Sequence, residues 1–256
     1  MRMLPVKRAY LIAIVLLVAL ALGGGGIYLF REHQNALALQ AERAKVAAER
    51  AAAAESYRRL SGILTRVNDS LDKVETLQST YFDLIQEATG ASHKRHDLFQ
   101  YNPGDVADAL TLTLLEKHAV ETMQPMTGQK ADAARAIASA LAEAYGETST
   151  AAVVADITAA SEAESEGLSD WWHAASDLAD QYSAYANGRY SGQTTDAGNL
   201  YTSSDDQAAR SQQLWYSISN RLVSLKKRLV NDVTTADAER GSDEGSSQAP
   251  LAKPQT

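Results

Sequence analysis

The sequence predicts an all-α protein with a single N-terminal transmembrane helix, a helical stalk and an antiparallel four-helix bundle-like domain. The run from Tyr10 to Phe30 holds 21 residues without a charge, close to the ~20 that cross a bilayer as a helix. Beyond it, apolar residues recur alternately three and four positions apart, which is the spacing of one helix face. Pro103 and Pro125 are the only prolines between positions 31 and 249, so few positions interrupt a helix.

The composition excludes several classes of function. The 256 residues include no cysteine, which rules out disulfides, thiolate zinc sites and cysteine nucleophiles. The chain holds 24 basic and 32 acidic residues, for a net charge of −8. Three of the bases, Arg2, Lys7 and Arg8, come before the apolar run, so the remainder is more acidic still. Such a domain repels phosphate backbones, and we expect no nucleic-acid binding.

Residues 1–9 form a basic flank, and residues 10–30 form the predicted signal-anchor helix. A cleaved signal peptide is the alternative, with Leu11 to Leu22 as its apolar core and a cut near Gly23. We favour the anchor because Ile27 to Phe30 resumes the apolar run up to Arg31. The preceding bases predict a cytoplasmic N-terminus. The protein would therefore be a single-pass protein of the cell (inner) membrane with an extracytoplasmic C-terminal domain.

Residues 31–56 are predicted to form the stalk, because they are rich in alanine and charge but lack a continuous apolar seam. In heptad notation, the d positions hold Leu39, Val46 and Ala53, whereas the a positions include Arg43 and Arg50. About 25 residues of helix would lift the following domain by about 37 Å.

Residues 57–238 are predicted to form the bundle, and its first helix carries the most regular seam. Gly90 is the expected end of this helix, and a connector follows from Ala91 to Gly104, marked by Asn102-Pro103-Gly104. The seam consists of Tyr57, Leu60, Leu64, Val67, Leu71, Val74, Gln78, Tyr81, Ile85 and Ala88.

The next helical segment is predicted from Asp105 to Tyr145, with an interruption at Pro125 and Gly128. A third helix follows Thr150 and ends at Gly188. Its seam weakens at Ser161 and Glu164, which suggests a kink or a solvated turn there. The seam positions are Val154, Ile157, Ser161, Glu164, Leu168, Trp171, Ala175, Leu178, Tyr182 and Tyr185.

A loop is expected from Asn187 to Ser203, followed by a basic last helix that starts near Asp205, and residues 239–256 are expected to be a disordered tail. The four segments predict an up-down-up-down bundle. This outline is similar to the ligand-binding bundles of membrane chemoreceptors, but those receptors re-enter the membrane and no motif is shared, so the sequence assigns no family. The seam of the last helix is Ala208, Trp215, Ile218, Leu222, Leu225 and Leu229.

The candidate chemistry is weak. His93 and His96 have the spacing of two metal ligands on one helix face, but the bases Lys94 and Arg95 between them would repel a cation. Glu162, Glu164 and Glu166 do not follow the ligand spacing of a calcium loop. No phosphate loop and no hydrolase motif is present. We therefore expect no enzymatic activity, no cofactor and no metal.

The functional prediction is a membrane-anchored structural or adaptor protein of the bacterial envelope, whose helical bundle docks a protein partner. The alternative is an extracytoplasmic, sensor-like bundle that binds a small ligand and has no signalling domain of its own. Self-association through the seams, giving a homo-oligomer, is a third possibility. Aromatic and apolar residues beside the seam or in the expected loop are the candidate contacts: Trp172, Tyr190, Leu200 and Tyr201.

Overall fold

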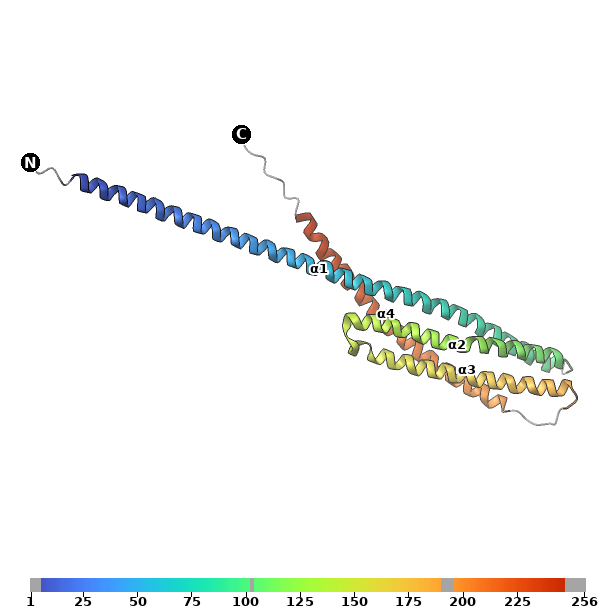
Figure 1. Ribbon diagram of the computed structural model, residues 1–256. Helices are drawn as coiled ribbons and strands as arrows, with labels where there is room; N and C mark the ends of the chain where they lie inside the picture. Colours follow the sequence, from blue (N-terminus) through green and yellow to red (C-terminus); the bar gives the residue numbers. More distant parts are fainter. Residues whose placement is uncertain (1–5, 102–103, 190–195, 247–256) are drawn as a thin grey trace, which may run out of the picture. The chain divides into compact units, whose positions relative to one another are not determined.

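The computed structural model describes residues 6–101, 104–189 and 196–246, with side chains described for 31–98, 104–189 and 196–240. The predicted all-α class is confirmed: the described residues form helices joined by turns, and they contain no strand (Figure 1). The elements are α1 (Val6–Tyr101), α2 (Val106–Tyr145), the short 3-10 helix η1 (Glu147–Ser149), α3 (Ala151–Ala186) and α4 (Ala197–Ser246).

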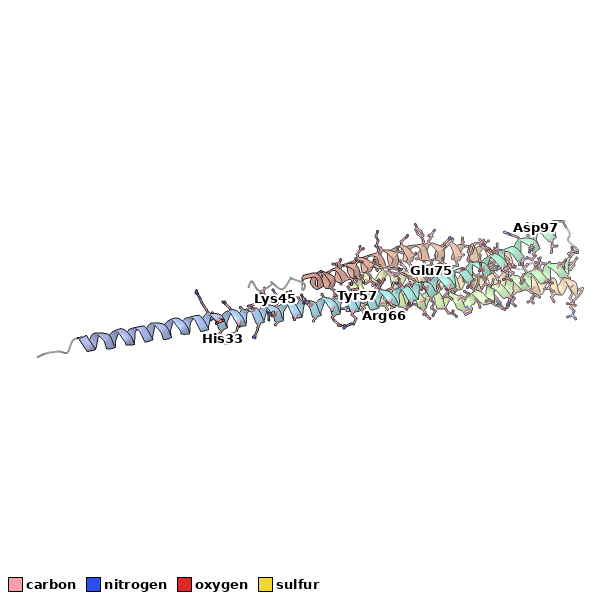
Figure 2. All side chains as sticks on the ribbon, turned by 90° about the horizontal axis from the view of Figure 1, so that it is seen from above. His33, Lys45, Tyr57, Arg66, Glu75 and Asp97 are labelled. Atoms are coloured by element: carbon pink, nitrogen blue, oxygen red, sulfur yellow. The ribbon has the colours of Figure 1, made fainter. Side chains whose placement is uncertain are left out.

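The chain divides into two compact units. One unit comprises Met1–Ser56 and Ala236–Thr256, and the other comprises Tyr57–Thr235. In the first unit, every residue of α1 from 31 to 52 is exposed, and Figure 2 shows the side chains of His33 and Lys45 standing out from the helix. This part of α1 therefore packs none of its residues into a core.

The second unit is a bundle in which neighbouring helices run in opposite directions. Arg66 of α1 forms an ion pair with Glu143, near the end of α2, at 2.5 Å. Arg95, near the end of α1, forms an ion pair with Glu116, in the first half of α2. Since residue numbers rise along α1 while the numbers of their partners fall along α2, the two helices are antiparallel. The turn between α2 and α3 begins at Gly146, whose φ of +85° suits a glycine, and its N–H bonds the carbonyl of Ala142 at 2.8 Å.

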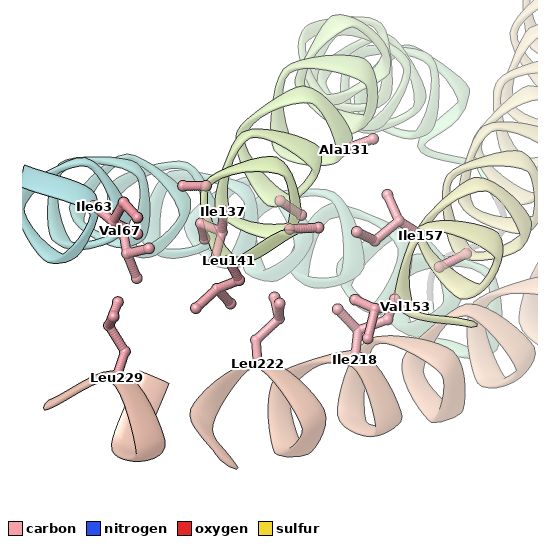
Figure 3. Packing of buried hydrophobic residues seen from close by; sticks show 14 residues of the cluster. Ile63, Val67, Ala131, Ile137, Leu141, Val153, Ile157, Ile218, Leu222 and Leu229 are labelled. Carbon is pink, nitrogen blue, oxygen red and sulfur yellow. The ribbon is translucent and has the colours of Figure 1, made fainter. Parts of the chain in front are cut away.

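Two apolar clusters fill the interior of the bundle. The first core cluster draws on all four helices and includes Val67, Leu141, Ile157 and Leu229 (Figure 3). Burying each such side chain contributes about 1.5–3 kcal/mol to the free energy of unfolding. The second core cluster consists of Ala88, Ala119, Val120, Met123 and Leu168, with Tyr81, Leu84, Ile85, Trp171 and Trp172 packed around it.

The end predicted for the first helix at Gly90 is wrong, because α1 continues to Tyr101. A helical glycine costs roughly 1 kcal/mol relative to alanine. Around it, Ala88, Ala91 and Arg95 are all buried. The burial of these residues outweighs the low helix propensity of Gly90.

The predicted interruption at Pro125 and Gly128 is also absent, since α2 runs unbroken with Pro125 inside it. A proline within a helix costs about 3 kcal/mol. Pro125 itself is exposed, whereas the neighbouring Met123, Met126 and Lys130 are buried. Tertiary contacts on the buried face thus hold the helix through the proline.

At the remaining boundaries, too, the helices extend further than the sequence predicted. The segment from Ser161 to Gly167 is regular helix within α3. The expected loop is shorter than predicted, because α4 begins at Ala197, and Ala197 is buried. Residues 239–246 of the predicted tail continue α4, and Arg240 forms an ion pair of 2.9 Å with Asp237 one turn earlier. The rest of that tail lies outside the described residues.

The predicted membrane segment, Tyr10 to Phe30, belongs to the backbone of α1, but its side chains lie outside the described part of the structure. Among the residues that the structure describes, no helix combines the length and the apolar character that a membrane crossing requires.

Candidate functional site

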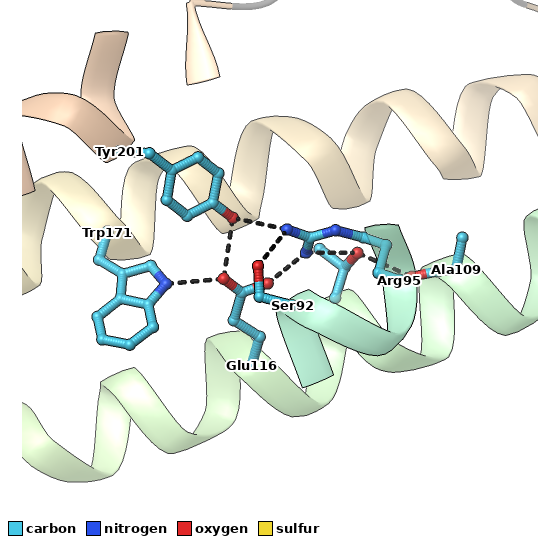
Figure 4. Close-up of polar contacts among 7 residues, drawn as sticks. Ser92, Arg95, Ala109, Glu116, Trp171 and Tyr201 are labelled. Atoms are coloured by element: carbon cyan, nitrogen blue, oxygen red, sulfur yellow. Dashed lines mark hydrogen bonds and ion pairs between the residues drawn. The ribbon is translucent and has the colours of Figure 1, made fainter. Parts of the chain in front are cut away.

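A buried ion pair at one level of the bundle joins all four helices. Arg95 of α1 and Glu116 of α2 are both buried and paired. The other carboxylate oxygen of Glu116 accepts hydrogen bonds from Trp171 Nε1 of α3 at 2.7 Å and from Tyr201 Oη of α4 at 2.9 Å (Figure 4). We call Arg95, Glu116, Trp171 and Tyr201 the first charged layer.

The donors of Arg95 are also engaged. One guanidinium nitrogen bonds Thr113 Oγ1 at 3.2 Å, and the other bonds Ser92 Oγ and Tyr201 Oη, each at 3.1 Å. Burial opposes the charged form of Arg95, but Glu116 and Tyr201 favour it, and the pKa of Arg95 is raised. Burial, together with Glu116, raises the pKa of Tyr201 well above its usual range. Arg95 therefore keeps its positive charge within a network of hydrogen bonds that joins all four helices.

A second buried ion pair lies between the two core clusters. Lys130 Nζ of α2 contacts Glu164 Oε1 of α3 at 2.6 Å, and Trp215 Nε1 of α4 donates to Glu164 Oε2 at 3.2 Å. The ammonium of Lys130 also lies over the rings of Trp215, at 4.4 Å, and Tyr81 of α1, at 5.0 Å. We call Tyr81, Lys130, Glu164 and Trp215 the second charged layer.

Burial shifts the pKa values of Lys130 and Tyr81 in this second layer. It lowers the pKa of Lys130 below its usual value, although Glu164 offsets part of the effect. Burial also raises the pKa of Tyr81 well above its usual range, assisted by the charge of Glu164 and a hydrogen bond to it. The aromatic rings on Lys130 compensate for lost hydration, since desolvated cation–π contacts contribute about 2 kcal/mol.

The two layers contain the same four kinds of residue, but in the second layer each kind comes from the next helix along the chain, and the tyrosine moves from α4 to α1. Each takes one base, one acid, one tryptophan and one tyrosine, and each takes one residue from every helix. On α1, α2 and α4 the corresponding positions are 14 residues apart, or about 21 Å along a helix. Because a charge must meet its partner, sliding one helix by a turn would leave a buried charge unpaired. We infer that the layers set the register of the bundle.

The spacing of residues in the sequence did not identify these residues as a site. One signal was available, because Glu164 occupies a seam position, where a charge is costly unless it is paired. The partner of a buried charge lies on another helix, however, and no spacing within one helix identifies it. In the described residues no group of three or more histidine, cysteine or acidic side chains could hold a metal.

The four predicted contact residues do not form one site in the described part of the structure. Trp172 of α3 is partly exposed, donates to Glu121 Oε1 at 2.8 Å and stacks under Lys117 at 4.5 Å. Leu200 and Tyr201 lie in the first turns of α4 instead of a loop, and Tyr201 belongs to the first charged layer. Tyr190 lies outside the described residues.

The outer surface of α4 carries an apolar row that the sequence analysis did not single out. Tyr216, Val223 and Val230 are 72, 58 and 40% exposed. Their spacing of seven residues places them along one side of the helix. Lys227 follows Val223 by four residues and so lies on the same side. We call Tyr216, Val223 and Val230 the α4 stripe.

The surroundings of the α4 stripe are basic. Between residues 207 and 231 the sequence has no acidic residue. Its bases there are Arg210, Arg221, Lys226, Lys227 and Arg228. Apolar residues at heptad spacing beside positive charge are suited to an amphipathic helix with acidic flanks.

Comparisons of the chain with protein-family models, with curated proteins and with solved structures found no match.

Proposed function

We propose that this protein is a membrane-anchored structural or adaptor protein of the bacterial envelope, and that its bundle docks an amphipathic helix of a partner protein on the α4 stripe. The observation that carries the proposal is the exposure of Tyr216, Val223 and Val230 at heptad spacing. Soluble proteins expose single apolar residues routinely, but a row of them is typical of an interaction surface.

The charges narrow the class of partner. Because the stripe lies on a stretch of α4 without acidic residues, the partner helix should carry apolar residues seven apart and glutamate or aspartate beside them. Complementary charges of this kind favour encounter and orientation more than affinity. The apolar residues would therefore supply most of the binding energy.

The stalk and the predicted anchor support the same function. Residues 31–56 of α1, which are all helical and are exposed apart from the half-buried Ala53 and Ala54, correspond to a rise of about 39 Å. With the anchor at Tyr10 to Phe30, such a stalk would hold a docking surface away from the bilayer. The two charged layers are consistent with this role, since they favour one fixed arrangement of helices.

The test is photo-crosslinking from the full-length chain in its own cells. A photoreactive amino acid replaces Tyr216 or Val223, and the control carries it at Ser224, which is exposed but lies about 100° further round the helix. We expect both stripe positions to capture one protein that the control does not capture. The captured contact should map to a helix with apolar residues at heptad spacing and acidic flanks.

A second variant tests the chemistry of the contact. Val223→Glu places an acid in the stripe, and capture from position 216 should then be lost while the circular dichroism of the chain is unchanged. Equal capture from Ser224, no capture from the stripe, or a contact in the captured protein without those helical features would each contradict the proposal. Capture of a second copy of this chain would mean that the stripe is a self-interface.

A further inference from the structure

The apolar face of α1 is buried within the bundle and becomes exposed along the stalk at Val46 and Leu39. Within the bundle the d position of the α1 heptad includes Leu60, which is half-buried, and Val67, which is buried. The same position continues back in steps of seven through Ala53, which is half-buried, and then through Val46 and Leu39. Leu39 and Val46 are 52 and 37% exposed. One unbroken helix thus carries one seam, which is buried at Val67 and exposed at Leu39 and Val46.

The residues at the a positions of the stalk determine which kind of partner can pack on its apolar face. The a positions hold Arg43 and Arg50, and each follows a glutamate at the g position, Glu42 and Glu49. In a parallel pair of helices, a side chain at a packs beside the preceding g residue of the facing helix. Each arginine of one copy would then meet a glutamate of the other, while its methylenes cover the seam.

The same pattern is unsuited to a purely apolar partner, because Arg43 would lose hydration without gaining a counter-charge. A second copy supplies both the apolar d residues and the matching glutamates at the correct spacing. Leu37, which is also exposed, occupies position b and takes no part in this pairing.

We propose that residues 39–53 of α1 pair with the same residues of a second copy as a parallel two-stranded coiled coil. The pairing is argued from residues of the stalk and does not use the α4 stripe. Its parallel direction also uses the predicted anchor, which would place both chains in one membrane with the same orientation and raise their effective concentration.

The absence of native cysteine allows a direct test by disulfide crosslinking of the full-length chain in intact cells. Single substitutions Leu39→Cys, Val46→Cys and Ala53→Cys probe the d position. The controls are Ala41→Cys and Ala48→Cys at position f, on the opposite side of the helix. We expect oxidation to give a covalent homodimer from each d variant and none from the f variants, since a disulfide requires Cα atoms within about 7 Å.

The direction of pairing has its own readout. Co-expressing the Leu39→Cys and Ala53→Cys chains with different tags should give homodimers of each tag but no mixed disulfide. A mixed disulfide without the two homodimers would indicate antiparallel pairing and overturn the proposal. Equal crosslinking from the d and f positions, or none from either, would overturn it as well.

Charge exchange tests the role of the glutamates. Arg43→Glu with Arg50→Glu should abolish the crosslink through Val46→Cys, because four acids would then face one another at each of the two positions. Adding Glu42→Arg and Glu49→Arg to the same chain should restore it. Failure of the restoring pair would contradict the proposed contact. None of these variants touches the α4 stripe, so the outcome is independent of partner docking.

Discussion

At the scale of single residues, Glu116 of the first charged layer joins the other three helices of the bundle to α2. Its side chain is fully buried, and its two oxygens accept bonds from helices α1, α3 and α4. A carboxylate in that position is tolerated only because every oxygen has a donor and the net charge is balanced by Arg95. Removing the charge leaves Arg95 as an uncompensated buried cation.

We therefore expect Glu116→Gln to lower the free energy of unfolding by about 3–5 kcal/mol, as measured by urea denaturation. Glu143→Gln is the matched control, since Glu143 also pairs with an arginine but at the surface, where ion pairs contribute little. Similar losses for the two variants would show that burial of the first charged layer has no energetic consequence.

Tyr145 gives a prediction about pH. Its hydroxyl donates to Asp232 Oδ2 at 2.7 Å, and burial followed by this hydrogen bond raises its pKa to about 12. Because the folded pKa exceeds the unfolded value of about 10, the contribution of Tyr145 to stability is complete below pH 10 and is lost as the pH rises towards 12. The difference in unfolding free energy between wild type and Tyr145→Phe should shrink over this interval. A difference that stays constant from pH 8 to 12 would contradict the assignment.

The charged layers also show what a sequence can indicate at the residue scale. Glu164 interrupts an otherwise apolar seam, and sequence reasoning treated the interruption as a weak point of the helix. Acidic residues are seldom buried, so a solvated turn was the natural interpretation. Only the packing of Lys130 and Trp215 from other helices identifies Glu164 as a core residue.

At the scale of elements, packing overrides local propensity in the bundle and makes the helices longer than propensity predicts. The all-α class followed from the seams, but the positions at Gly90 and Pro125 that were expected to break helices lie inside α1 and α2. Propensity describes an isolated segment, whereas these segments are held by buried residues on either side. Sequence patterns therefore predicted the existence of the helices better than their ends.

The glycines of α2 and α3 allow a matched test of this idea. A methyl group at Gly128 would meet nothing within 4 Å, whereas at Gly167 it would lie 3.1 Å from Gln207 Cβ and 3.3 Å from the carbonyl oxygen of Ser204. Gly128→Ala should raise the unfolding free energy by about 0.5–1 kcal/mol through helix propensity. Gly167→Ala should show no gain or a loss, because α3 and α4 would have to separate. Equal stabilisation of both variants in thermal melts would contradict the close approach.

At the scale of the whole molecule, the interactions that stabilise the fold are concentrated in one unit. Both core clusters lie between residues 57 and 235, and so do both charged layers. The stalk has no buried residue among positions 31–52. Cooperative unfolding arises where buried side chains depend on one another, so the stalk should contribute little to the stability of the bundle.

A chain reduced to residues 57–240 should therefore fold by itself and unfold in one cooperative transition at nearly the melting temperature of the full-length protein. Circular dichroism at 222 nm would give the transition, and hydrogen exchange would show protected amides in all four helices. If the stalk pairs between copies, the full chain should additionally show a melting temperature that rises with concentration, and the shortened chain should not. A broad, non-cooperative melt of the shortened chain would mean that residues before Tyr57 are needed to complete the core.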